Sequence, residues 1–173
     1  ITGYININSF NLTGTVQISK PASPNPVTLD SPASEVMTDL RKLHAAVIAP
    51  NITMEVANNY MMHRGVRTLL VMNDDNSLAG IITATDILGE KPMRFIQERG
   101  IKHSEILVQD MMTPLEKLEA IPLEEVTHAR VGNIVASLRE SDRLHALVID
   151  ENTIGLSRIC GIFSWTQIEK QLG

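Results

Sequence analysis

The feature that most constrains the fold of this chain is an internal repeat. The segment Met37–Leu43 (MTDLRKL) returns as Met112–Leu118 (MTPLEKL). Further along, Gly80–Thr83 (GIIT) returns as Gly161–Ser164 (GIFS). Self-similarity of this kind is the signature of an architecture built from copies of one supersecondary unit. The sequence therefore predicts two related units, with small insertions in the second, the larger of them in the turn around residues 151–157.

Each copy predicts the same order of elements: a short strand, a helix, two strands and a second, short helix. In the first copy the long helix is bounded by Thr53, a typical N-cap, and Gly65, a typical stop. The elements expected in the first copy are a strand at 45–48, a helix from 53 to 65 with the stripe Val56, Ala57, Tyr60 and Met61, strands at 67–72 and 78–82, and a helix at 83–88. Those expected in the second copy are a strand at 120–121, a helix capped by Thr127 with the stripe Val131, Ile134, Val135 and Leu138, strands at 144–149 and 159–163, and a helix at 164–172.

A copy of roughly 60 residues buries too little surface to be stable alone, so the two copies are expected to share a core. We therefore predict an α+β fold of two pseudo-symmetric β-α-β-β-α units that pack sheet to sheet and leave clefts between them, where ligands commonly bind. A helix at 92–99, stopped by Gly100, connects the units. The expected organisation is an N-terminal extension and linker (1–30), a first unit with its connecting helix (31–98) and a second unit (99–173).

Residues 1–30 stand outside the repeat. Ile5 and Ile7 alternate with polar residues, as do Val16 and Ile18, and a Thr-Gly-Thr turn at 13–15 separates the two runs. Alternation on both sides of a turn is typical of a β-hairpin. We predict a hairpin here, followed by a linker that has prolines at positions 21, 24 and 26.

Composition argues against several classes of function. The 173 residues carry a formal charge of -5, whereas nucleic-acid binders need clustered basic residues. Cys160 is the single cysteine, so no intramolecular disulfide can form, as expected in a reducing compartment, and its apolar neighbours place it in the core. No apolar run approaches the roughly 18 residues of a membrane span, and the first residues show no signal-peptide pattern. We expect a cytoplasmic protein that binds no nucleic acid and spans no membrane.

The sequence also lacks the patterns of common catalytic and metal sites. The five histidines, at positions 44, 63, 103, 128 and 145, show no metal-ligand spacing, and there is no cysteine pair. Neither a glycine-rich phosphate loop nor a recognisable nucleophile–base pair occurs. We therefore predict a protein that is not an enzyme, holds no metal and requires no cofactor.

The segment Gly80–Asp86 (GIITATD) places a strand directly before a helix, with Thr83 at the expected N-cap and Asp86 three residues later. One interpretation is structural, because these two side chains can form a capping box. The other interpretation gives the same geometry to a ligand. Free amides at a helix start suit a phosphate, and a carboxylate beside them can accept hydrogen bonds from the vicinal hydroxyls of a ribose. The sequence leaves both interpretations open.

The second copy departs from this pattern at one position. Ser164 keeps the hydroxyl at the cap, but Gln167 stands where the first copy has an acid. A glutamine can still complete a capping box, yet it lacks the charge that strengthens hydrogen bonds from hydroxyls. We expect one competent ribose grip, at Asp86, and a weaker or empty second site.

The order of these motifs resembles a known family. Met-Thr, a short strand, Pro50-Asn51-x-Thr53, a helix, His63–Val66 (HRGV), a strand and then Gly80–Asp86 together resemble a CBS domain. The two copies resemble a Bateman module, which is a pair of CBS domains, over about residues 34–172. The first 30 residues are not covered by the resemblance.

The resemblance implies a flat homodimer and a cleft that takes AMP, ADP, ATP or S-adenosylmethionine. It implies that Asp86 holds the ribose hydroxyls, that Thr83 lies near phosphate and that adenine lies against the strand before the first long helix. The ligand-binding residues implied in the first copy are Thr83, Asp86, Ala46, Val47, Ile48, Arg67, His63 and Arg64. Those implied at a weaker second site are Ser164, Gln167, Arg143 and His145, with Arg139 beside them. For each basic residue, the alternative is a solvated surface charge.

Two hypotheses about function follow. In the first, the chain is a regulatory module in which an adenosine-containing ligand shifts the relative orientation of the copies or of two protomers, and an unidentified effector protein reads that shift. In the second, a degenerate pair of domains acts as a ligand-independent dimerisation scaffold. Asp86 favours the first hypothesis and Gln167 the second.

Overall fold

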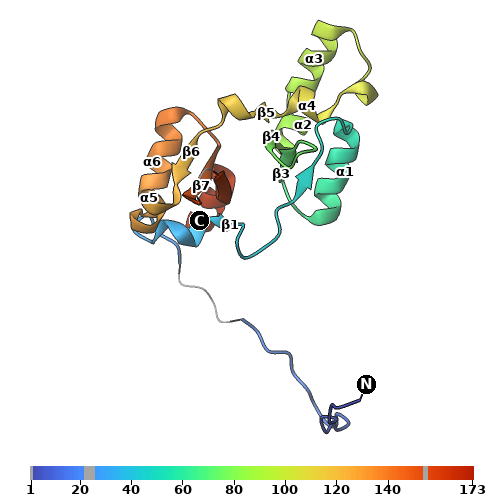
Figure 1. Ribbon diagram of the computed structural model, residues 1–173, viewed down its shortest axis with the longest axis vertical. Coiled ribbons are helices and arrows are strands. Elements are labelled where there is room, and N and C mark those ends of the chain that lie inside the picture. Colours follow the sequence, from blue (N-terminus) through green and yellow to red (C-terminus); the bar gives the residue numbers. More distant parts are fainter. Residues whose placement is uncertain (1, 22–25, 154–155) are drawn as a thin grey trace.

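The computed structural model describes residues 2–21, 26–153 and 156–173. Two lobes lie side by side, each built on a four-stranded sheet, as Figure 1 shows. This arrangement confirms the predicted α+β class with two related units. No helix of the described residues is long and apolar enough to cross a membrane.

The first lobe comes mainly from the first repeat. Its elements are β2 (Val47–Ile48), α1 (Met54–Arg64), β3 (Thr68–Met72), β4 (Leu78–Thr83), α2 (Ala84–Leu88), α3 (Lys91–Arg99), η2 (His103–Glu105), α4 (Val108–Met111) and β5 (Thr113–Pro114). The order within the sheet is β2-β3-β4-β5, with β2 parallel to β3 and the other pairs antiparallel. The helices α1 and α3 begin and end within two residues of the predicted helices.

Helix α1 has the predicted caps but a shifted buried face. The Thr53 side chain accepts a hydrogen bond from the Val56 amide (3.3 Å), and Gly65 ends the helix at φ 66°, a left-handed conformation that favours glycine. The buried side chains are those of Met54, Ala57 and Met61. Val56, which the sequence analysis placed in the stripe, is 53% exposed. Two residues of the predicted stripe, Ala57 and Met61, are therefore buried as expected, and Met54 packs in the core where Val56 does not.

The second lobe comes mainly from the second repeat. Its elements are η1 (Ala33–Val36), β1 (Thr38–Asp39), η3 (Leu115–Lys117), β6 (Ala120–Pro122), α5 (Leu123–His128), α6 (Val131–Ser141), β7 (His145–Thr153), β8 (Leu156–Ser164) and α7 (Trp165–Leu172). The order within this sheet is β1-β8-β7-β6, with β6 parallel to β7. Residues 154 and 155, in the turn where the sequence analysis placed the larger insertion, lie outside the described residues.

The prediction that Thr127 caps the long helix of the second copy is wrong. Thr127 lies within α5, where its hydroxyl donates to the carbonyl of Glu124 (2.6 Å). Helix α6 begins four residues later, and the Asn133 side chain accepts from the amide of its N-cap residue, Arg130 (2.8 Å). The predicted apolar stripe of α6 is confirmed, since all four of its residues are buried. An unpredicted short helix therefore occupies the place assigned to the cap.

The first short strand of each repeat lies in the sheet of the other repeat. Strand β1 of the first repeat pairs antiparallel with β8, and β5 of the second repeat pairs antiparallel with β4. The 3-10 helix η1 continues this exchange, because Ala33 and Val36 are buried in the core of the second lobe. Each lobe thus depends on a segment of the other repeat, and the domain boundaries at 31, 98 and 99 stay a prediction from the sequence.

Two equivalent glycines make this exchange possible. A Cβ atom on Gly80 would collide with the backbone carbonyl oxygen of Thr113, and one on Gly161 would collide with the side chain of Met37. These are the glycines that open the repeated GIIT and GIFS segments. Glycine is needed at both positions because an exchanged strand passes closely over the sheet there.

The predicted N-terminal hairpin is not confirmed. Residues 2–21 contain no strand, and the Ile5 and Ile7 side chains are 96% and 93% exposed. A two-stranded hairpin is at most marginally stable in water without an apolar surface to pack on. The alternation of apolar residues therefore does not lead to a hairpin here. Residues 22–25, part of the predicted linker, lie outside the described residues.

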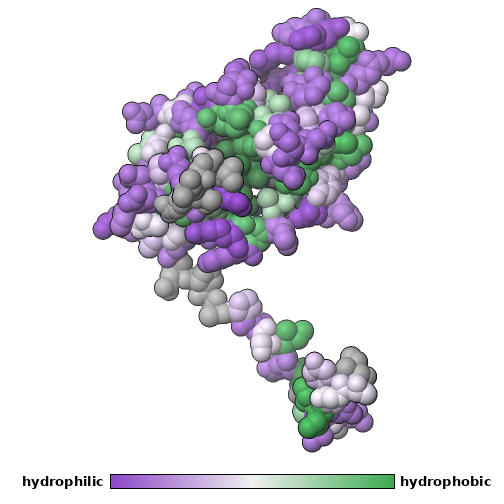
Figure 2. Space-filling view, in the orientation of Figure 1, coloured by the Kyte–Doolittle hydropathy of each residue, from purple (hydrophilic) through white to green (hydrophobic). Residues whose placement is uncertain are grey.

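The two sheets face each other across a small apolar cluster. Leu70 and Ile81 of the first lobe and Leu147 of the second form its buried centre, and partly buried side chains from both lobes surround it. Figure 2 shows apolar side chains gathered where the lobes meet, with polar side chains around the periphery. The predicted sheet-to-sheet packing is therefore confirmed, and its edge is where a shared cleft can form.

Candidate functional site

A cleft of about 200 Å³ lies between the two repeats. Its residues come from the end of β4, the start of α2, β5 and the segments that precede β6 and β7. They are Ile81, Thr83, Thr85, Asp86, Thr113, Lys117, Leu118, Glu119, Asp142, Arg143, Leu144 and His145. The structure thus places Thr83 and Asp86 of the predicted first site in one cleft with residues of the second repeat.

The carboxylate of Asp86 is held by two donors. Its Oδ2 accepts from the amide of Thr83 (2.9 Å), while the Thr83 hydroxyl accepts from the Asp86 amide (3.1 Å), so the capping box is present. Its Oδ1 accepts from Nζ of Lys91 (2.7 Å). A carboxylate has about four acceptor positions, so both oxygens keep capacity for further hydrogen bonds. The capping and the ligand-binding interpretations of this motif are therefore compatible.

Three amides at the start of α2, where the sequence analysis expected free amides for a phosphate, are used within the protein. The amide of Ala84 donates to the carbonyl of Arg67 (2.8 Å), and the amides of Thr83 and Asp86 are used in the capping box. The helix itself has only five residues. Thr85, in the first turn of α2, lines the cleft and its amide is not one of these three, so the expectation of a phosphate at this helix start stays a prediction.

Basic side chains reach the cleft from the second repeat instead. Arg143, His145 and Lys117 line the wall opposite Asp86. The sequence analysis assigned Arg143 and His145 to a separate second site, whereas the structure places them in the same cleft as Asp86, because the two lobes face each other here. The Arg143 Nε lies 3.9 Å from Glu119 Oε1, a distance that leaves its guanidinium only weakly engaged.

His145 is the titratable group of the cleft whose state is most affected by the fold. Burial lowers the pKa of its imidazole, and the nearby Asp86 carboxylate acts in the opposite direction with a smaller effect. Its Nε2 lies 3.4 Å from the hydroxyl of Thr68, which belongs to the first lobe. The neutral ring thus sits at the junction of the two sheets, where an anionic ligand would favour its protonation.

The remaining predicted residues of the first site lie away from this cleft. Ala46 and Ile48 pack against the core of the first lobe, and Val47 is 44% exposed without lining the cleft. The Arg64 guanidinium stacks on the Tyr60 ring and donates to its hydroxyl (2.8 Å). His63 and Arg67 are exposed and do not line the cleft either. The structure therefore does not bring these residues together with Asp86 in one cavity.

The equivalent position in the second copy is built differently. Gln167 Oε1 accepts from the hydroxyl of Thr38 (3.3 Å), and Ser164 contacts the Thr166 hydroxyl (3.0 Å). Ser164 makes no side-chain capping hydrogen bond, so the capping box expected from Gln167 is absent. The guanidinium of Arg139 stacks on Trp165. Neither cleft described for this structure is lined by Ser164 or Gln167.

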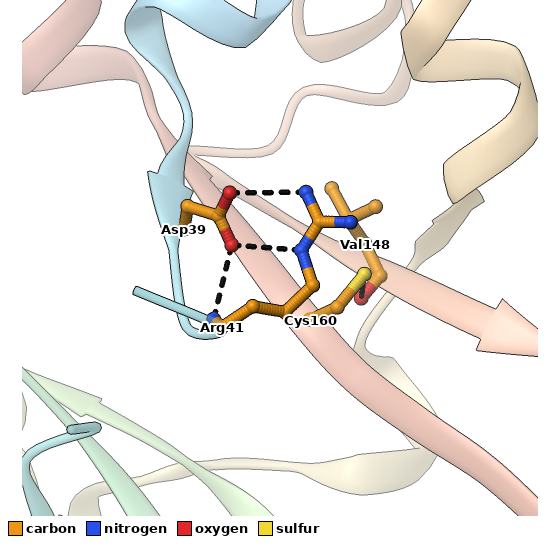
Figure 3. A network of polar contacts seen from close by, with 4 residues as sticks. All are labelled: Asp39, Arg41, Val148 and Cys160. Carbon is orange, nitrogen blue, oxygen red and sulfur yellow. Dashed lines mark hydrogen bonds and ion pairs between the residues drawn. The ribbon is translucent and has the colours of Figure 1, made fainter. Parts of the chain in front are cut away.

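The exchanged strand β1 carries a polar cluster, drawn in Figure 3. Arg41 pairs with Asp39 through two hydrogen bonds, from Nε to Oδ1 (2.9 Å) and from Nη2 to Oδ2 (3.0 Å). These bonds lower the pKa of the Asp39 carboxyl from 3.8 to about 2. Cys160, beside this pair, is buried with its thiol directed at the Val148 carbonyl (3.6 Å), which confirms its predicted place in the core. Burial raises the pKa of this thiol, so the cluster is structural rather than nucleophilic.

Sequence reasoning missed two lysines and a threonine of the site. Lys91 lies just before the predicted connecting helix, Lys117 lies outside the predicted strands and helices, and Thr113 lies in an exchanged strand too short to show periodicity. The repeat itself carried a usable signal, since Thr113 and Lys117 fall within the returned MTPLEKL segment. Among the described residues, no group of three or more histidine, cysteine, aspartate or glutamate side chains is arranged to hold a metal ion.

Comparison with known proteins matches one segment of the chain to a family. Residues 33–92 match the family model of the CBS domain. The chain contains a CBS domain and has the fold of a CBS-domain pair. No curated protein matches the sequence.

Solved structures support the fold of the whole CBS pair. An uncharacterized conserved protein from Pyrococcus horikoshii is 23% identical, with a TM-score of 0.59 over 83% of this chain and 93% of its own. CBSX2 in complex with AMP is 19% identical, with a TM-score of 0.54 over 81% and 94% of the two chains. A structure of the same CBS-pair protein comes from Arabidopsis thaliana. The CBS domain pair of protein MJ0100, solved with 5′-methylthioadenosine and S-adenosylmethionine, is 16% identical, with a TM-score of 0.53 over 84% and 95%.

Proposed function

We propose that this CBS pair is a regulatory module that binds one adenosine-containing ligand per chain in the cleft beside Asp86. The observation that carries the proposal is a carboxylate that lines a cleft between the repeats, with basic side chains of the second repeat on the opposite wall. The proteins of similar fold that were solved with AMP, 5′-methylthioadenosine and S-adenosylmethionine support this class of ligand.

The ribose is assigned to Asp86. Each carboxylate oxygen already accepts one hydrogen bond, from the Thr83 amide and from Lys91, and each retains capacity for one more. Two vicinal hydroxyls match two adjacent acceptors on one carboxylate. Hydrogen bonds to a charged acceptor are about twice as strong as neutral ones, so the charge of Asp86 matters more than its shape.

The charges of the cleft favour a ligand with few negative charges. Its lining contains two permanent cations, Lys117 and Arg143, but three carboxylates, those of Asp86, Glu119 and Asp142. A triphosphate would add several negative charges to a lining whose carboxylates already outnumber its permanent cations, whereas a monophosphate needs only Lys117, Arg143 and His145. We therefore place AMP and S-adenosylmethionine ahead of ATP as ligands of this site.

Regulation would follow from the position of the cleft. Asp86 belongs to the first repeat and Arg143 to the second, so a ligand that contacts both is bound more tightly in one relative orientation of the lobes than in another. Such a difference in affinity is what shifts a conformational equilibrium. A second copy of the chain and an effector protein are the partners that we propose to read the shift, in agreement with the homodimer implied by the family resemblance.

Calorimetric titration with AMP, ATP and S-adenosylmethionine tests the assignment. Changing Asp86→Ala should weaken binding of the preferred ligand by about 10- to 100-fold, because hydrogen bonds to a charged group are lost. The matched control is Gln167→Ala, at the equivalent position of the second repeat, which should leave the affinity unchanged. Equal affinities of the wild-type protein and Asp86→Ala would contradict the role of Asp86.

A ligand-independent scaffold is the second candidate. The contact between Gln167 and Thr38 favours it for the second copy, because an amide that bonds to its own chain does not need a ligand. In that case none of the three ligands would bind or raise the melting temperature, which a true ligand does by mass action. The protein would still form dimers, which analytical ultracentrifugation would detect without added nucleotide.

A further inference from the structure

The side chain of Lys91 approaches Asp86 from outside the cleft. Lys91 is the first residue of α3, and its Nζ donates to Asp86 Oδ1 (2.7 Å) and to the carbonyl of Met111 (3.3 Å). It does not line the cleft, whereas Asp86 does. The amine is thus a second point of attachment for a carboxylate whose other oxygen is fixed by the Thr83 amide.

Stability alone gives little reason for this ion pair. The Lys91 side chain is 48% exposed, and exposed ion pairs contribute little to folding. Asp86 is different, because only 14% of its side chain is exposed and its single backbone contact fixes one oxygen only. With both oxygens held, the plane of the carboxylate is fixed. With one held, the free oxygen can turn toward water or toward another donor.

The same amine also contacts the segment that leads into the exchanged strand β5. Met111 ends α4, and Thr113 of the cleft wall follows two residues later in the exchanged strand β5. Lys91 therefore connects the residue that faces the ligand with the segment that carries the opposing strand into the first lobe. Two acceptors, the Asp86 carboxylate and the Met111 carbonyl, fix the position of the Lys91 amine, as expected of a group that orients a neighbour.

We propose that Lys91 is a positioning residue that orients Asp86 toward a vicinal diol and so sets the preference of this site for ribose over deoxyribose. The inference rests on the proposed function. A correctly oriented carboxylate gains from two hydroxyls at once, and a misoriented one gains from only one. Loss of Lys91 should therefore reduce the affinity for a ribonucleotide while leaving that for a deoxyribonucleotide nearly unchanged.

Titration of AMP and 2′-deoxy-AMP into wild-type protein, Lys91→Met and Lys91→Arg tests this. In Lys91→Met the affinity for AMP should fall about threefold to tenfold, the effect of one oriented hydrogen bond, and that for 2′-deoxy-AMP should stay within about twofold. The ratio of the two affinities should approach one. Lys91→Arg keeps a charged donor and should retain most of the ratio.

The possible outcomes separate the two proposals. An unchanged ratio in Lys91→Met, or a gain in AMP affinity that reveals Lys91 as a competitor for Asp86, would overturn the role of Lys91 while nucleotide binding stands. Absence of binding of both AMP and S-adenosylmethionine by the wild-type protein would overturn both proposals. Melting temperatures of the variants within a few degrees of the wild-type value would show that a change in the ratio does not come from unfolding.

Discussion

The two halves of the molecule use one strand–helix motif for different purposes. In the first half, Asp86 caps its helix, pairs with Lys91 and lines a cleft. In the second half, Gln167 neither caps its helix nor lines a described cleft, and it bonds to Thr38 of the exchanged strand. The comparison shows that a strand–helix junction of this fold forms without an acid at the position equivalent to Asp86. The acid in the first half is then best explained by something other than folding.

The exchanged strands differ in the same way. Strand β5 crosses Gly80 with its rigid backbone, whereas Gly161 lies under the flexible side chain of Met37, the residue before β1. A collision with backbone cannot be relieved by a rotamer change, but a collision with a methionine can. The two equivalent glycines should therefore differ in how costly they are to replace.

The largest effect on stability is expected for Gly80→Ala. The new methyl group would meet the Thr113 carbonyl and push β5 away from β4, at a cost of about 2–3 kcal/mol. Gly161→Ala should cost about 1 kcal/mol, because Met37 can move. Urea denaturation followed by circular dichroism measures both. A larger loss in Gly161→Ala than in Gly80→Ala would show that the exchange is held more rigidly in the second lobe.

Sequence patterns predicted the fold well where an element was long enough to show a period. The apolar stripe of α6, the caps of α1 and the four long strands all follow from local spacing. The strands β1 and β5 have two residues each, too few for any period, so their exchange between repeats could not be inferred. Thr127 was misplaced because a good cap residue also occurs inside short helices, where its hydroxyl can bond to the preceding turn.

The site was only half predictable for a related reason. Thr83 and Asp86 are neighbours in sequence, so their motif was visible without a structure. Arg143 and His145 are expected at a separate second site, because a repeat suggests that each copy completes its own site, but they line the cleft of Asp86. Facing sheets instead bring the basic residues of one copy to the acid of the other. Such pairing is a property of packing, and no local pattern reports it.

A second comparison between the halves concerns pH. At equivalent positions, the first half has Thr68 and the second half has His145, which lines the cleft beside Asp86. His145 pairs with Ser164 across its sheet as Thr68 pairs with Thr83. Burial lowers the pKa of His145, so the ring is neutral in the free protein at pH 7. A phosphate beside it would raise this pKa, and binding would then take up a proton.

The affinity for AMP should therefore rise as the pH falls from about 8 to 6, by at most tenfold per pH unit for one proton. Titrations at several pH values, with protein and ligand in buffers of different ionisation enthalpy, would also count the proton directly. In His145→Gln the pH dependence should disappear while some affinity remains. A pH dependence that survives this substitution would assign the proton to the phosphate or to another residue.

The smallest effect is expected at the base of β1, where Asp39 and Arg41 form a clamp and the equivalent position of β5 is Pro114. The pKa of Asp39 is lowered in the folded protein, so its contribution to stability is present above its ordinary value of 3.8 and is lost as the pH falls toward 2. Because the Arg41 side chain is 53% exposed, Asp39→Asn should lower the melting temperature at pH 7 by no more than about 2 °C. Between pH 4 and 2 the wild-type protein should lose more stability than the variant, since only the wild-type carboxyl takes up a proton there. Parallel acid-unfolding curves for the two proteins would mean that the exchanged strand is held by its sheet alone. The ion pair between Asp39 and Arg41 would then be as dispensable for folding as the capping box that is absent at Gln167.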